Sequence, residues 1–276
     1  QQISALAGAL LYVRTGVPFE TAWMTRIQSA NPSMQVFDAR DGIALREMKD
    51  QDHDAHGHDV KRDKHERRTA RSEEHGHGDK HGKGAAESHG HDAHGEHDSH
   101  AKHESHEAEH HGHHEQDPHV WVSPPLVRHM VGRIRDKLAE LAPEHAADFA
   151  RNCDAFVAEL DALDNELHKL LGPLSIRKFM VFHPAWGYFA DAYGLTQVPI
   201  EREGKEPGAR ALVALIDQAK QENIQVVFVQ PQFDRRSASQ VAQAIDGGVV
   251  AVDPLAADYV DNLRRVGRQF AEALQP

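Results

Sequence analysis

Residues 179–200 read FMVFHPAWGYFADAYGLTQVPI, and this stretch decides the fold. A short apolar run at 179–182 is followed by a helical pattern over 185–193, and a second run of strand-forming residues follows at 197–200. A helical segment between two short runs of this kind is typical of a β-α-β unit with parallel strands.

The same alternation continues to the end of the chain. Further strands are predicted at 226–229 and 249–252, and further helices at 209–221, 236–245 and 258–274. Strands and helices in strict alternation predict a parallel sheet with helices on both faces.

The beginning of the chain repeats this pattern on a smaller scale. Strands are predicted at 9–14 and 34–38, and Pro18 begins a helix that extends to residue 30, since proline is favoured at the first helical position. Apolar residues then recur every three or four positions over 123–173, which predicts a long, nearly continuous helix that Pro143 interrupts or kinks. The fold class is therefore α/β, with two Rossmann-like lobes joined by a long backbone helix. The chain starts without Met or a signal peptide, so we expect the N-terminal lobe to be truncated.

Residues 52–116 have a different composition. They contain no Leu, Ile, Phe, Trp, Tyr or Met, and they hold 18 of the 23 histidines. Such a segment buries too little apolar surface to offset the entropy of ordering, so we expect a disordered loop in the absence of metal. The loop is either a solubilising linker or a set of weak metal sites that capture metal beside a stronger one.

These patterns divide the chain into five parts. They are the remainder of the N-terminal lobe (1–51), the His-rich loop (52–116), a short segment that carries a metal ligand (117–122), the linking helix (123–173) and the C-terminal lobe (174–276).

Composition excludes several functions. The formal net charge of -12 argues against a nucleic-acid partner, because phosphate binding needs a basic surface. A single cysteine excludes an internal disulfide and a thiolate zinc finger. No stretch approaches the roughly 18 consecutive apolar residues of a membrane span.

Three residues are candidate metal ligands. His183 and Asp253 each follow a predicted strand and precede a proline, which places them at the carboxyl edge of the sheet, where ligands bind in parallel α/β folds. His119 lies in DPHVWVSP, where apolar residues return after the His-rich loop. Structural roles are the alternative for each: a hydrogen-bonding histidine, a capping aspartate, and a last histidine of the loop. Two imidazoles and a carboxylate suit zinc, whereas manganese prefers more oxygen ligands.

Other polar and aromatic residues have weaker claims. Trp121, Trp186 and Tyr188 are expected to form an apolar wall around the site. Glu201, Glu203 and Glu206 lie in the loop IEREGKEP, which either faces the metal or, as we expect, forms a solvated turn.

Five segments, in this order and around a His-rich insertion, resemble a known family. They are DPHVWVSPPLVRHM, FHPAWGYFADAYGL, EPGARALVALIDQAK, VVFVQPQF and AVDPLAADYVDNLRRV. The chain is similar to the metal-binding solute-binding proteins of ABC importers, in particular the zinc-uptake branch.

The resemblance implies a ligand set and a function. The family's metal ligands fall on His119, His183 and Asp253, and a further family ligand lies upstream of Gln1. Relatives that carry manganese tend to have a carboxylate at the position of His183, so the resemblance favours Zn²⁺ over Mn²⁺. It implies a non-enzymatic, monomeric protein of the periplasm or the extracytoplasmic membrane surface, which captures zinc with high affinity and delivers it to an ABC importer permease.

Two other functions remain open at this stage. One is a zinc storage or sensor protein that acts through the His-rich loop. The other is a zinc-dependent hydrolase, with Glu206 as a general base.

Overall fold

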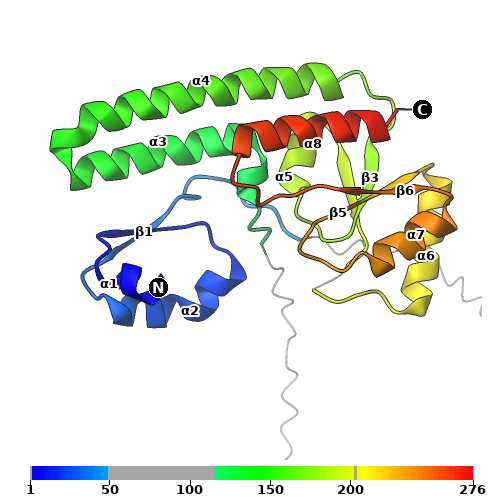
Figure 1. The fold of residues 1–276 in the computed structure, drawn as a ribbon, viewed down its shortest axis with the longest axis horizontal. Coiled ribbons are helices and arrows are strands. Elements are labelled where there is room, and N and C mark those ends of the chain that lie inside the picture. The colour runs from blue at the N-terminus through cyan, green and yellow to red at the C-terminus, as the bar shows by residue number, and fades with distance from the viewer. Residues whose placement is uncertain (1, 49–115, 202–203, 276) are drawn as a thin grey trace, which may run out of the picture. The chain divides into compact units, whose positions relative to one another are not determined.

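The C-terminal half of the chain forms a four-stranded parallel sheet in the computed structural model, which describes residues 2–48, 116–201 and 204–275 (Figure 1). The strand order is β4-β3-β5-β6. The bounds are β3 Lys178–Val181, β4 Thr196–Pro199, β5 Val226–Val229 and β6 Gly248–Ala251. All four predicted strands are confirmed, each within one residue.

Helices cover both faces of this sheet because successive side chains of a strand point to opposite faces. Phe179 and Val181 belong to one buried cluster, together with residues of the helices α4 (Ala146–Leu171), α5 and α8. Met180 and Val227 belong to a second buried cluster, together with residues of α6 and α7. The bounds are α5 Gly187–Tyr193, α6 Ala209–Gln221, α7 Arg236–Ala244 and α8 Tyr259–Ala273.

The N-terminal segment is a small α/β unit, as predicted. Strand β1 (Leu11–Arg14) pairs in parallel with β2 (Gln35–Asp38), and α2 (Pro18–Ala30) connects them. A short helix, α1 (Gln2–Ala7), precedes β1.

The expectation of one nearly continuous helix over 123–173 is wrong. The segment forms α3 (Pro124–Leu141), a short 3-10 turn at Pro143–His145, and α4 (Ala146–Leu171). Figure 1 shows α3 and α4 lying antiparallel and side by side. The reversal has a local cause, because a proline disfavours helical backbone at the residue before it, and Ala142 has φ -140° and ψ 73°.

The two ends of the insertion meet in the folded part of the chain. Glu47 forms an antiparallel β-bridge with Gln116, and the Asp117 amide donates a hydrogen bond to the Arg46 carbonyl (2.9 Å). The predictions of disorder and of metal capture for the His-rich loop concern residues outside the described ones.

Among the described residues, no helix is both long and apolar enough to cross a membrane.

Candidate metal-binding site

His183 lies directly beyond the carboxyl end of β3, as predicted. Its backbone is fixed by Gln230, which follows β5 and is 1% exposed. The Gln230 side-chain amide donates to the His183 carbonyl (2.7 Å), and its oxygen accepts from the His183 amide (3.4 Å). The histidine therefore leaves the sheet at a defined point.

The His183 ring is oriented by a buried carboxylate. Its Nδ1 lies 3.2 and 3.3 Å from the two carboxylate oxygens of Glu201, and the ring stacks on Phe233 with 4.9 Å between centroids. Glu201 is only 5% exposed, so the expectation that it lies in a solvated turn is wrong. Because an ionised carboxylate can only accept, Nδ1 carries the proton and the neutral ring presents Nε2 as a lone-pair donor.

Burial lowers the pKa of His183 below its usual value, because a partly desolvated ring disfavours the charged form. The nearby Glu201 carboxylate opposes this shift without reversing it. The ring is therefore neutral at neutral pH, which is the state that binds metal.

His119 is part of the folded segment and shows the same arrangement. It precedes the 3-10 turn Val120–Val122, whose two valines are buried. Its Nδ1 lies 2.8 Å from Asp117 Oδ1, and its backbone amide donates to the same oxygen (3.0 Å). Asp117 is 1% exposed. Here too a buried carboxylate fixes the ring and leaves Nε2 available.

The structure brings these two histidines together. Their ring centroids lie 5.3 Å apart at an interplanar angle of 77°. Histidines that ligate metals almost always donate their other ring N–H to a carboxylate, a carbonyl or water. Two imidazoles held in this way fit a metal that takes nitrogen ligands, such as zinc.

Asp253, the third candidate, follows β6 but is not grouped with the histidines. Its Oδ1 accepts from the Leu255 amide and from the Gln232 side chain, both at 2.9 Å. Within residues 2–48, 116–201 and 204–275, no group of three or more His, Cys, Asp or Glu side chains is arranged to hold a metal ion. Asp253 stays a predicted ligand.

Trp121 connects the neighbourhoods of His119 and Asp253. Its indole N–H donates to the Pro254 carbonyl (2.9 Å), and its ring centroid lies 5.3 Å from that of His119. Of the predicted aromatic wall, Trp121 thus lies beside His119 and also has a polar function, whereas Trp186 packs on Phe189 and Phe270.

Sequence reasoning missed two residues that orient the site. Gln230 follows a strand and precedes a proline, the same pattern that identified His183 and Asp253, so the signal was available. Asp117 lies two residues before His119, where its carboxylate can reach both the ring and the backbone amide.

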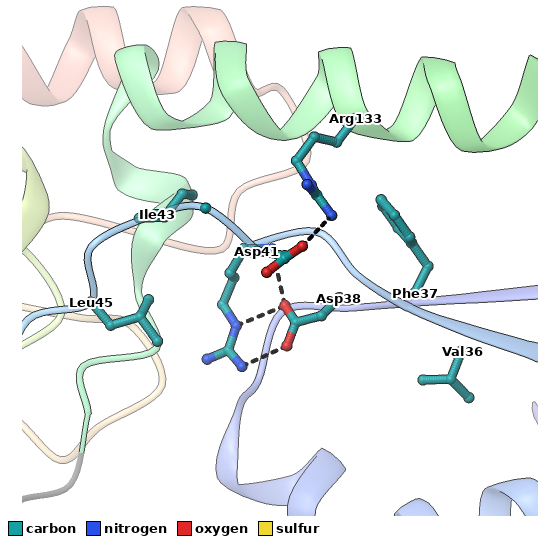
Figure 2. Close-up of a pocket in the computed structure, with 9 residues that line it drawn as sticks. Val36, Phe37, Asp38, Asp41, Ile43, Leu45 and Arg133 are labelled. Atoms are coloured by element: carbon teal, nitrogen blue, oxygen red, sulfur yellow. Dashed lines mark hydrogen bonds and ion pairs between the residues drawn. The ribbon is translucent and has the colours of Figure 1, made fainter.

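A separate hollow of about 410 Å³ lies beyond the end of β2 (Figure 2). Figure 2 shows its apolar side chains, among them Phe37 and Ile43, beside charged ones. The charges are paired with one another: Arg40 with Asp38 at 2.9 and 3.0 Å, and Arg133 with Asp41 at 2.9 Å. We assign no ligand to this hollow.

The chain is similar to a known family and to several known proteins. Residues 1–273 match the family model described as "Zinc-uptake complex component A periplasmic". The high-affinity zinc uptake system protein ZnuA of Brucella abortus is 33% identical over 148 residues, which cover 52% of this chain and 44% of that protein. The chain spans about half the length of the curated relatives it matches.

Solved structures agree over a larger part of the chain. A crystal structure of ZnuA matches with a TM-score of 0.74 and 34% identity, covering 100% of this chain and 83% of the other. A zinc-bound ZnuA deletion mutant matches equally well, with the same TM-score, identity and coverage.

The fold is therefore that of a two-lobed α/β protein of the ZnuA type, with a histidine pair beyond the end of a parallel strand. The chain belongs to the family of periplasmic zinc-uptake component A proteins.

Proposed function

We propose that this chain is a high-affinity zinc-binding protein that captures zinc outside the cytoplasmic membrane and delivers it to the permease of an ABC importer. One observation carries the proposal. His119 and His183 lie with ring centroids 5.3 Å apart, and each has its Nδ1 beside a buried carboxylate. Both rings can therefore present Nε2 to a single ion.

The proposed ligands are His119, His183 and Asp253. Asp253 would complete the set through a movement of the loop that follows β6. Its Oδ1 already accepts two hydrogen bonds, whereas its Oδ2 has no hydrogen bond among those described and would be the atom that binds the ion. Two nitrogens and one oxygen favour zinc over manganese.

Relatives support the substrate and the location. ZnuA of Brucella abortus is a high-affinity zinc uptake system protein, a ZnuA deletion mutant was solved with zinc bound, and the family description places its members in the periplasm. We extend these properties to this chain, together with a monomeric state and a role in binding rather than in catalysis.

Zinc affinity of ligand variants tests the proposal. Competition with a chelator, at less than one equivalent of zinc, reports the tightest site of the full chain. His119→Ala and His183→Ala should each weaken this site by more than ~100-fold, since loss of an outer-shell partner alone costs about 10–100-fold. His168→Ala is the matched control, because its Nδ1 also contacts an aspartate, Asp164, but it lies on α4. Unchanged affinity in the His119→Ala, His183→Ala double variant would disprove the proposal.

Deletion of residues 52–115 separates the proposal from its alternatives. If the chain is a transport binding protein, the deletion variant should still bind one zinc ion tightly. A storage or sensor protein predicts that most binding is lost, and a hydrolase predicts zinc-dependent turnover of ester or amide substrates.

A further inference from the structure

Three segments of the chain meet at the hydroxyl of Tyr188. This residue is in the first turn of α5 and is 4% exposed. Its hydroxyl donates to the Asp117 carbonyl (2.9 Å) and accepts from the Arg46 amide (2.9 Å). One buried hydroxyl thus joins α5 to the two chain segments that flank the insertion, at Arg46 and at Asp117.

The Arg46 side chain reinforces the same junction. Its guanidinium donates to the Gly187 carbonyl (3.0 Å), forms an ion pair with Asp191, and lies 3.6 Å from the Asp117 carboxylate. The approach is so close that a Cβ atom on Gly187 would lie 2.7 Å from Arg46 Nε and 2.8 Å from Asp117 Oδ2. Any larger residue at position 187 would therefore displace the Arg46 or the Asp117 side chain.

Helix α5 is connected to both histidines of the candidate site. It begins four residues after His183, so the chain ties it directly to that ligand. Through Tyr188 it holds Asp117, and Asp117 accepts hydrogen bonds from the ring and the amide of His119. The separation of the two rings therefore depends on how Asp117 sits against α5.

We infer that Tyr188 is a positioning residue for the zinc site, acting through Asp117 on His119. The inference rests on the proposed zinc-binding function. Loss of the hydroxyl leaves the aromatic ring in place but frees the Asp117 carbonyl and the Arg46 amide. The His119 ring then has more conformational freedom to lose when it binds zinc, so affinity falls.

Helix α5 provides a matched control. Tyr193 is on the same helix and is also 4% exposed, and its hydroxyl donates to the carboxylate of Asp164 on α4 (2.9 Å). Tyr188→Phe and Tyr193→Phe thus each remove one hydroxyl from a buried ring. The first loses two hydrogen bonds and the second loses one, each worth about 1 kcal/mol of stability.

The test compares both variants in the full chain. Three quantities are measured: the zinc dissociation constant by chelator competition below one equivalent, the zinc dissociation rate by stopped flow, and urea unfolding of the zinc-free protein. We expect Tyr188→Phe to raise the dissociation constant about tenfold, the lower end of the range for outer-shell partners, mainly through faster dissociation. Tyr193→Phe should change the dissociation constant less than about twofold, although it also lowers the free energy of unfolding, by about 1 kcal/mol.

A double variant tests the route through Asp117. Because both changes act on His119, Tyr188→Phe should have little further effect on zinc affinity in an Asp117→Asn background. Wild-type affinity in Tyr188→Phe, equal weakening by Tyr193→Phe, or additive effects in the double variant would each overturn the inference. If the proposed function itself is wrong, the wild-type chain should show no single tight zinc site, which distinguishes that outcome from the variant results above.

Discussion

At the scale of the residue, the site consists of two histidines and the carboxylates that orient them. Asp117 and Glu201 are both almost fully buried, and each faces the Nδ1 atom of one histidine. Burying a carboxylate is costly unless it is hydrogen-bonded. Each contact therefore stabilises the buried carboxylate and at the same time orients the histidine ring. Zinc affinity should therefore depend on residues that never touch the metal.

Glu201→Gln tests this dependence. The amide keeps the size of the side chain but no longer stabilises the ring with a negative charge, so zinc affinity should fall about 10–100-fold. Chelator competition measures the effect. Glu206→Gln, in the same loop, where Glu206 accepts from Ser237 (3.0 Å), should stay near the wild-type value. Equal affinities for Glu201→Gln and wild type would mean that this carboxylate does not support the site.

The protonation of His183 gives a second prediction at this scale. Burial lowers its pKa and Glu201 opposes the shift. In the zinc-free protein, an NMR titration of the ring should therefore have its midpoint below 6.5, the ordinary value. Glu201→Gln removes the opposing charge, so its midpoint should be lower still. A midpoint above 6.5 would show that the carboxylate, and not burial, dominates. An upward shift in the variant would show that Glu201 does not raise the pKa of His183 at all.

At the scale of the element, the helices are held by close packing that single glycines permit. Gly267 on α8 faces Leu167 on α4, and an added Cβ would lie 2.2 Å from Leu167 Cδ2. Leu167 is fully buried, so it has little room to move. The approach of α4 to α8 therefore requires glycine at this position.

Gly267→Ala should destabilise the protein by about 1–3 kcal/mol, the usual effect of overpacking a core. Gly132→Ala, inside α3, should have the opposite sign and stabilise by about 0.5–1 kcal/mol, because nothing lies within 4 Å of the added Cβ and alanine is the better helix former. Urea unfolding of the zinc-free protein measures both. Two changes of the same sign would contradict this account of helix packing.

Local patterns predicted the strands and most helices, because short apolar runs and three-to-four-residue spacing are local properties. They failed at Pro143, since the apolar spacing is the same on both sides and cannot reveal that α3 and α4 fold back on each other. The strand-then-proline pattern identified His183. Glu201 also directly follows a predicted strand, but the charged residues after it favoured a solvated turn, and only the folded sheet places it beside His183.

At the scale of the whole molecule, the proposed zinc binding would be coupled to folding. A ligand that binds only the folded state stabilises that state in proportion to the logarithm of its concentration relative to the dissociation constant. Free zinc at 100 times the dissociation constant should raise the free energy of unfolding by about 2.7 kcal/mol.

This stabilisation should persist after deletion of residues 52–115, and it should disappear in the His119→Ala, His183→Ala double variant. Urea unfolding with and without zinc provides the measurement. Stabilisation that vanishes with the deletion, or that survives in the double variant, would place the tight site elsewhere in the chain.

The most direct measurement is a crystal structure of the full chain with one equivalent of zinc, using anomalous scattering at the zinc edge to locate the ion. We predict one strong peak within about 2.0–2.2 Å of the Nε2 atoms of His119 and His183. A peak held only by histidines of residues 52–116, with the His119 and His183 rings free of metal, would contradict the central claim.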